Sequence, residues 1–265
     1  MSKTPAILII IALLALPSWA QEDGGDLSKK LANPVASLIS VPIEANYDKH
    51  IGPNEKGSTW TVKIQPVIPF SLTEDWNLIS RTILPVIDQD DVPVRGMGES
   101  GIGDIVQSFF FSPKKPSSRG WIWGVGPVLL LPTASDDALG FEKWGAGPTA
   151  VALKQTGPWT CGILVNHIES FAGDDDRAYV SASYMQPFLN YITRTKTTIQ
   201  LNTESTYDWA SDQWSVPINF GVYQLIKIGG IPMQFGGGVR YWADSADNGP
   251  EDWGFRLKLT FLFPK

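Results

Sequence analysis

The last strand-like stretch of the chain, WGFRLKLTFLFPK, alternates between two kinds of side chain. Successive side chains of a strand point to opposite faces, so this stretch predicts a strand with one apolar face and one polar face. A soluble sheet would pack the apolar face on a core, whereas a membrane barrel would turn it to lipid and line a lumen with the other. The apolar set is Trp253, Phe255, Leu257, Leu259, Phe261 and Phe263, and the opposite set is Gly254, Arg256, Lys258, Thr260 and Leu262.

Strand length favours the membrane interpretation. Strands of soluble proteins are usually about 5–6 residues long, whereas a tilted strand that crosses a bilayer needs about ten. Twelve stretches of roughly that length or more follow Ala36, and the alternation recurs in STWTVKIQPVIPF, TTIQLNTESTY and QWSVPINFGVYQL. The predicted strands are 36–46, 59–70, 75–88, 101–111, 120–132, 145–156, 158–170, 179–191, 196–208, 213–226, 231–243 and 253–263.

The connections differ in length and charge. The longer ones include YDKHIGPNEKGS, QDDVPVRGMGES, PTASDDALGFEK and DSADNGPED, and most are acidic; the others include SLTE, ITRT and KIGG, and this set holds several Lys and Arg residues. This alternation is typical of an all-β, up-and-down antiparallel transmembrane barrel with long extracellular loops and short periplasmic turns. A Greek-key sandwich, the alternative, gives no reason for it.

Prolines inside the predicted strands do not fit a regular ladder. Proline lacks the N–H that a ladder needs and is normally confined to strand edges and bulges. Because a barrel has no edge, we expect bulges at these positions. They are Pro66, Pro85, Pro127, Pro148, Pro187 and Pro217.

The N-terminal residues predict export. Lys3, the apolar run AILIIIALLAL and the sequence SWA before Gln21 are typical of a secretory signal peptide over residues 1–20. Residues 21–35 are polar and predict a short helix that lies either in the periplasm or as a plug inside the barrel. Residues 36–265 form the predicted outer-membrane barrel, and the single cysteine, Cys161, allows no internal disulfide.

Two sets of side chains follow from the strand pattern. Tryptophans near strand ends suit membrane interfaces, and polar residues on the cleaner strand faces are candidates for lining the lumen. The predicted girdle is Trp60, Trp76, Trp121, Trp144, Trp159, Trp214, Trp242 and Trp253. The lumen candidates are Lys63, Gln65, Gln200, Asn202, Glu204, Asn219, Arg240, Arg256 and Lys258. If they pair across the barrel the lumen is plugged, and if they face water it is a pore.

Catalytic and cofactor chemistry have little support in the sequence. The net charge of −6 and the lack of a basic patch argue against a nucleic-acid partner. His167 and Glu169 share a strand face, and Ser170 or Ser181 is a conceivable nucleophile, yet Ser170 falls on the opposite face. We therefore expect no enzymatic activity, no cofactor and no metal site, and we expect the acidic loops to be solvated.

The runs LANPVASLISVPIEANYD, IQPVIPFSLTEDWNLISRTILPVI, GIGDIVQSFFFSPKKP and GVGPVLLLPTASDDALGFEKWGAGPTAVALKQTGPWT resemble the bacterial outer-membrane "transporter" or meta-pathway phenol-degradation channels. Many members carry the label neuromedin U. The resemblance implies passive passage of small, often aromatic or hydrophobic, molecules, with membrane lipid, lipopolysaccharide and the barrel assembly machinery as partners of a monomer. A non-conducting structural or adhesive barrel is the alternative, and a lipid-acting enzyme is a third. Phe263 is followed by Pro264 and Lys265, so the terminal aromatic residue with which outer-membrane barrels commonly end is displaced.

Overall fold

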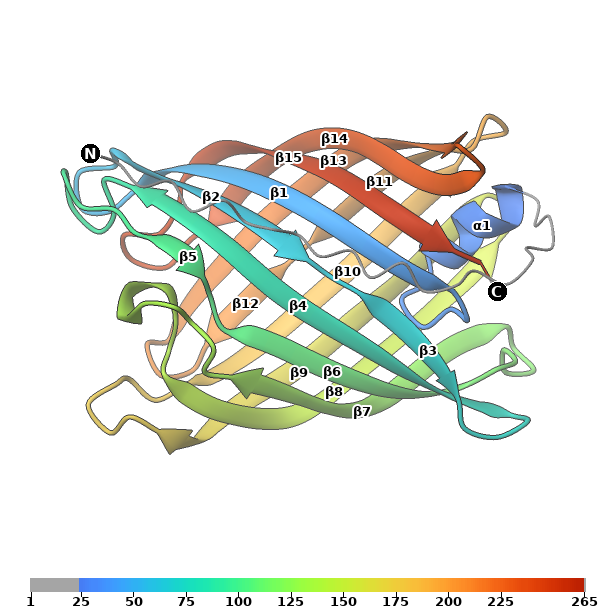
Figure 1. The fold of residues 1–265 in the computed structure, drawn as a ribbon, viewed down its shortest axis with the longest axis horizontal. Helices are drawn as coiled ribbons and strands as arrows, with labels where there is room; N and C mark the ends of the chain where they lie inside the picture. The colour runs from blue at the N-terminus through green and yellow to red at the C-terminus, as the bar shows by residue number, and fades with distance from the viewer. Residues whose placement is uncertain (1–23, 265) are drawn as a thin grey trace.

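The computed structural model describes residues 24–264, which form a closed antiparallel barrel of 12 strands (Figure 1). One helix, α1 (Gly24–Leu31), precedes the barrel, and a short 3₁₀ helix, η1 (Asp137–Leu139), lies in a loop. The strand segments are β1 (Ile39–Ile51), β2 (Gly57–Ile64), β3 (Val67–Ser71), β4 (Trp76–Asp90), β5 (Ser100–Ile102), β6 (Ile105–Pro113), β7 (Trp121–Leu131), β8 (Lys143–Thr156), β9 (Trp159–Gly173), β10 (Ser181–Ile192), β11 (Thr197–Thr203), β12 (Ser205–Asp208), β13 (Gln213–Ile228), β14 (Ile231–Asp244) and β15 (Asp252–Phe263).

The barrel closes between its first and last strands, where β1 pairs with β15 from Ile39↔Phe263 to Tyr47↔Phe255. Neighbours in the sequence are otherwise neighbours in the wall. Three barrel strands are each broken into two segments, namely β2 and β3, β5 and β6, and β11 and β12. The 12-stranded barrel confirms the prediction and rules out the sandwich.

The prolines lie beside irregularities, as expected from their missing donor. Pro66 separates β2 from β3, and Pro85 faces the break between β5 and β6, where its carbonyl accepts from Gly103. Pro187 and Pro217 flank the break between β11 and β12 from the strands on either side. Pro127 and Pro148 face each other. Because a proline has no N–H to donate, each of these residues leaves one hydrogen bond of the ladder unmade, and the adjacent strand can bend there.

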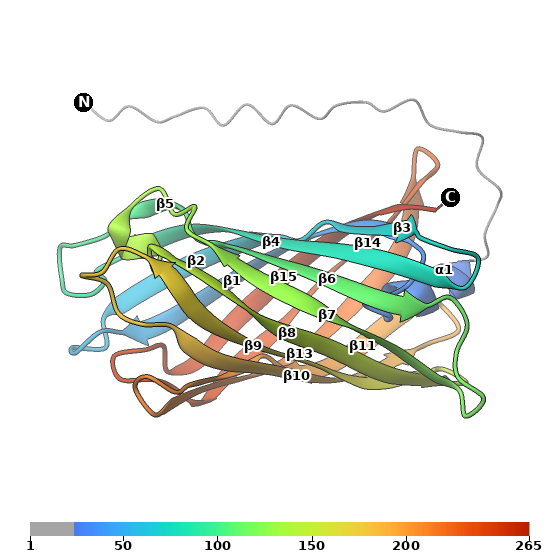
Figure 2. The ribbon, with the colours of Figure 1, turned by 90° about the horizontal axis from the view of Figure 1, so that it is seen from below.

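The segment that precedes β1 enters the barrel at the end that carries the short turns, here called the short-turn end (Figure 2). Leu27 of α1, Ala36 and Leu38 form an apolar cluster with Leu225 and Leu262 of the wall. Strand pairing therefore starts at Ile39 rather than at Ala36, because Ala36 and Leu38 pack inside the barrel. The first connection is also shorter than predicted, since the strands extend to Ile51 and resume at Gly57.

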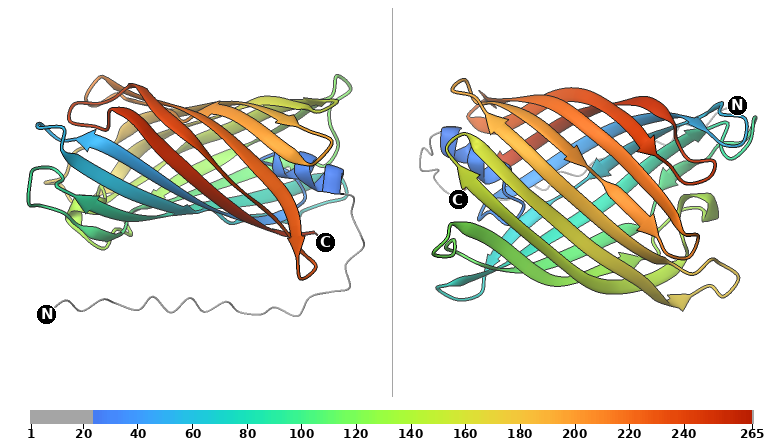
Figure 3. Two further views of the ribbon diagram at one scale, coloured as in Figure 1. Left: turned by 90° about the horizontal axis from the view of Figure 1, so that it is seen from above. Right: turned by 180° about the vertical axis from the view of Figure 1, so that it is seen from behind.

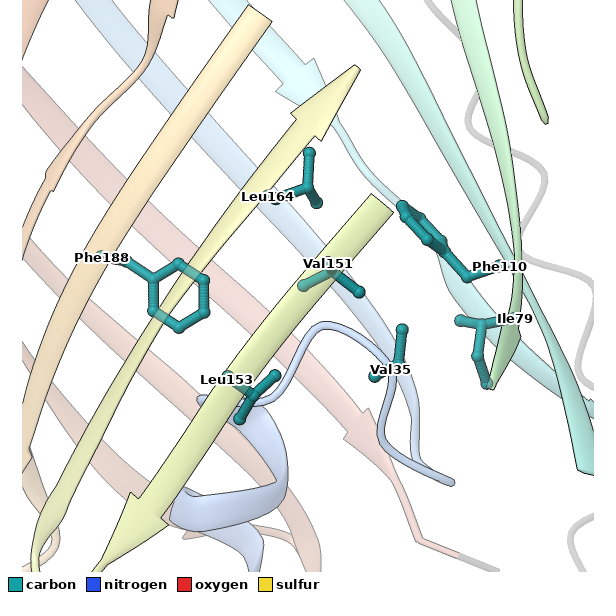
Figure 4. Packing of buried hydrophobic residues seen from close by; sticks show 7 residues of the cluster. All are labelled: Val35, Ile79, Phe110, Val151, Leu153, Leu164 and Phe188. Carbon is teal, nitrogen blue, oxygen red and sulfur yellow. The ribbon is translucent and has the colours of Figure 1, made fainter. Parts of the chain in front are cut away.

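A second apolar cluster fills the lumen beside this segment. Val35 packs against inward side chains of five strands, and the cluster lies next to α1 (Figure 4). Its members are Val35, Ile79, Phe110, Val151, Leu153, Leu164 and Phe188. Two hydrogen bonds hold the segment to the wall, from Gln155 Nε2 to the Lys29 carbonyl at 2.8 Å and from Asn77 Nδ2 to Ser37 Oγ at 2.8 Å. Residues 24–38, here called the entering segment, thus occupy the mouth at this end.

The outer surface is apolar, as the C-terminal strand predicts. Trp253, Phe255 and Leu257 are exposed, whereas Arg256 and Leu262 are buried. The strands are tilted around the whole wall (Figure 3). Exposed apolar residues occur on strands from β2 to β15. Among the described residues, no helix is long and apolar enough to cross a membrane.

Seven of the eight predicted girdle tryptophans lie on this outer surface, with exposed fractions from 36% to 57%. Trp76, Trp121 and Trp159 begin strands at the short-turn end, and the other four begin strands at the opposite, long-loop end. Trp242 was predicted wrongly. It shares the inward face of Arg240 two residues earlier, stacks on its guanidinium at 4.6 Å and donates to Asp48, while Tyr241 takes the outward position.

Candidate functional site

The nine predicted lumen residues all lie on the inner side of the wall. Gln65, Asn202, Asn219, Arg240 and Arg256 are buried. Lys63, Gln200, Glu204 and Lys258 line the internal cavity described below.

Glu204 is the centre of an ion network that crosses the lumen. It occupies the break between β11 and β12, and its side chain is 8% exposed. Its two oxygens lie 3.1 Å from Lys63 Nζ and 2.8 Å from Arg256 Nη1. Lys63 stands on β2, and four barrel strands, β13, β14, β15 and β1, lie between it and Glu204 by the shorter way round. A strand break flanked by Pro187 and Pro217 therefore places one carboxylate where cations of distant strands meet.

The network continues along the β1 side of the lumen. Arg256 also lies 3.2 Å from Glu44 Oε1 and donates from Nε to Asn46 Oδ1 at 2.7 Å. Arg240 lies 3.0 Å from Asp48 Oδ1. A buried charge is tolerated only when it is paired, and these three carboxylates pair with Arg240 and Arg256, although Nε and Nη1 of Arg240 and Nη2 of Arg256 make no hydrogen bond within residues 24–264.

Glycines make room for the larger groups on the β13–β14 wall. A Cβ on Gly221 would lie 2.3 Å from the Tyr223 hydroxyl, and one on Gly236 would lie 2.0 Å from the Val222 carbonyl. The Tyr223 ring can therefore lie along the wall, and Lys258 Nζ sits 4.1 Å from its centroid. Lys258 also donates to Gln200 Oε1 at 3.0 Å.

A cavity of about 470 Å³ runs beside the network. At one end it is lined by Ser28 and Leu31 of α1, and at the other by Phe141 and Val180, which precede β8 and β10 at the long-loop end. Between these ends the wall combines the charged residues of the network with apolar residues such as Val106. We call this cavity the lumen cavity. Glu44, Lys63 and Glu204 of the ion network are part of its lining.

The sequence prediction missed several lumen residues. They are Glu44, Asp48, Arg81, Tyr184 and Tyr223, which all lie inside the barrel. The alternation in ISVPIEANYDKHI, where Ser40, Glu44, Asn46 and Asp48 oppose Ile39, Val41, Ile43, Ala45 and Tyr47, carried a usable signal for β1. Arg81 and Tyr184 lie in strands whose polar and apolar residues are less well separated.

The histidine considered for catalysis lies on the outer face near the long loops. His167 Nδ1 is 3.0 Å from Ser183 Oγ on the adjacent strand, and Nε2 is 3.8 Å from Glu169. Ser183 also accepts from Trp209 Nε1 at 2.9 Å. Ser170 points inward, where it accepts from the Val180 N–H, so it does not contact this histidine. In residues 24–264, no group of three or more His, Cys, Asp or Glu side chains is arranged to hold a metal ion.

The acidic loops at the long-loop end are tied together by Arg177. Its Nε lies 3.2 Å from Glu142 Oε2, and its guanidinium donates to the Asp137 carbonyl at 2.7 Å. The Asp137 side chain, hydrogen-bonded to Glu142, raises the pKa of the Glu142 carboxyl above its usual 4.5. The loop between β7 and β8 is thereby joined to the loop between β9 and β10.

A comparison with one solved structure agrees with the barrel architecture. The chain superposes on the COG4313 outer membrane channel from Pseudomonas putida F1 with a TM-score of 0.67 and 15% identity, over 86% of this chain and 96% of that one. The outer membrane phospholipase of Salmonella typhi gives a TM-score of 0.49 and 11% identity, over 90% and 98%. No protein-family model and no curated protein matches the sequence. The first likeness shows that this chain has the fold of a bacterial outer-membrane channel.

Proposed function

We propose that this chain is an outer-membrane channel through which small molecules, including aromatic or hydrophobic ones, pass without an energy source. The observation that carries the proposal is the lumen cavity, because its lining reaches from the loops at one end to the entering segment at the other. The apolar outer band and its tryptophans suit lipid and lipopolysaccharide as surroundings. A monomer suffices, since one chain closes the barrel.

The orientation follows from the same features. We assign the short-turn end to the periplasm and the acidic loops to the cell exterior, as in other outer-membrane barrels. Export through the signal peptide and delivery by the assembly machinery belong to this proposal, and the predicted signal peptide lies outside the described residues. The absence of enzymatic activity also stays part of the proposal.

Single-channel recording of the refolded mature chain in a planar bilayer tests the proposal. We expect discrete, low-conductance steps, because the ion network and the entering segment narrow the lumen. Folding and insertion are checked independently by heat-dependent mobility on a gel. A folded, inserted protein that never conducts, and that passes no small solute into proteoliposomes, contradicts the channel.

The second candidate is a non-conducting structural barrel. Two observations favour it, namely the Lys63–Glu204 bridge across the lumen and the apolar packing of the entering segment. The two candidates differ in how the current responds when the entering segment is loosened. Removal of the contacts of Val35 and Leu27 raises the current of a gated channel and leaves a structural barrel silent.

A further inference from the structure

Two cations in the lumen form no direct ion pair with the carboxylates of the ion network. Lys63 pairs with Glu204, and Arg256 pairs with both Glu204 and Glu44. Arg81 and Lys258, in contrast, have no carboxylate within 4.0 Å among residues 24–264. Arg81 donates from Nη2 to Gln65 Oε1 at 2.9 Å, and Lys258 contacts Gln200 and the Tyr223 ring. Both cations line the lumen cavity.

The lining of the cavity carries an excess of positive charge. Its only carboxylates are Glu44 and Glu204, and both are engaged by the cations named above. Its cations are Lys30, Lys63, Arg81 and Lys258, of which Lys30 is bridged to Asp26 within α1 at 3.1 Å. A charge in a partly desolvated lumen interacts more strongly than one in water. The cavity is therefore suited to an anionic group.

Apolar side chains stand next to these cations. Val67 is the register partner of Arg81 across the β3–β4 ladder, and it packs against the apolar cluster that contains Phe188. Val67 and Phe188 line the same cavity, as does Tyr184. An arginine can bind a carboxylate through two parallel hydrogen bonds, while rings and aliphatic groups bury an apolar body.

We infer that the lumen cavity binds small organic monoanions with an apolar body, such as aromatic carboxylates, with Arg81 and Lys258 as the cations available to the anionic group. The inference rests on the proposed function in that the same cavity is the path of the solute. It adds a charge preference that the channel fold does not require. The acidic loops act outside, and salt screens their repulsion over about 8 Å at physiological ionic strength.

Fluorine NMR titration of the full mature chain in detergent micelles tests the site. The probes are 4-fluorobenzoate and the neutral 4-fluorobenzamide of nearly the same shape, with empty micelles as the blank. We expect the benzoate to bind at least about tenfold more tightly than the amide. Hydrogen bonds to charged groups are worth roughly a tenfold to hundredfold change in affinity, so Arg81→Met should weaken benzoate binding by that factor and leave amide binding unchanged.

Lys258→Met should weaken benzoate binding in the same way, and Arg81→Lys should retain most of the preference. Lys154→Met is the matched control, because Lys154 is an exposed cation of β8 outside the cavity. Heat-dependent gel mobility selects the variants that fold. Equal affinities for the two probes, or equal losses in Lys154→Met and Arg81→Met, overturn the anion site. A protein that conducts but binds the two probes equally supports the channel and contradicts the anion site. A protein that prefers benzoate but never conducts supports the anion site and contradicts the channel.

Discussion

At the scale of the residue, Glu204 is the group on which the lumen network depends. Replacing it with Gln removes the charge that Arg256 and Lys63 share, and leaving a buried charge without its partner costs about 3–5 kcal/mol. We expect Glu204→Gln to unfold at a lower guanidinium concentration than the unchanged protein. The shift of the folded band on a gel measures this unfolding. Glu169→Gln changes an outward residue that is 59% exposed; it is the control and should change little.

Adding Lys63→Met to Glu204→Gln should recover part of the lost stability, because Arg256 keeps Glu44. No recovery means that the charges of Lys63 and Glu204 are not coupled.

At the scale of the element, the strands were predictable and their breaks were not. A period of two over stretches such as Trp253–Phe263 decides which side chains face out, so the number of strands and the nine lumen residues followed from pattern alone. Trp242 was assigned to the wrong face because a position near a strand end does not show whether a side chain points inward or outward. Its spacing of two residues from the inward Arg240 does show it. The Glu204 network needed contacts between strands far apart in the wall, and no local pattern encodes these.

The two loops joined by Arg177 give an element-scale prediction that depends on pH. The pKa of Glu142 is raised in the folded protein through its hydrogen bond with Asp137. Proton binding therefore favours the folded loop between β7 and β8, in which Asp137 and Glu142 share a hydrogen bond, and this loop gains stability as the pH falls through this pKa and loses it as the pH rises. We expect protease cleavage in residues 132–142 to slow from pH 7 to pH 5. Glu142→Gln should abolish this dependence and cleave slowly at both values, whereas an unchanged pH profile in this variant contradicts the assignment. Asp244→Asn, in β14, is the matched control.

At the scale of the whole molecule, we expect the entering segment to control whether the barrel conducts. Ser37 and Asn77 are joined by a 2.8 Å hydrogen bond, so cysteines at both positions, in a Cys161→Ser background, should form a disulfide that fixes the segment to β4. If solutes pass only when the segment moves, the oxidised protein should show little current and reduction should restore it within the same bilayer. The single variant Asn77→Cys in that background should ignore the reductant. Equal currents before and after reduction mean that the path avoids the segment, and the lumen cavity would then need a different exit through the wall.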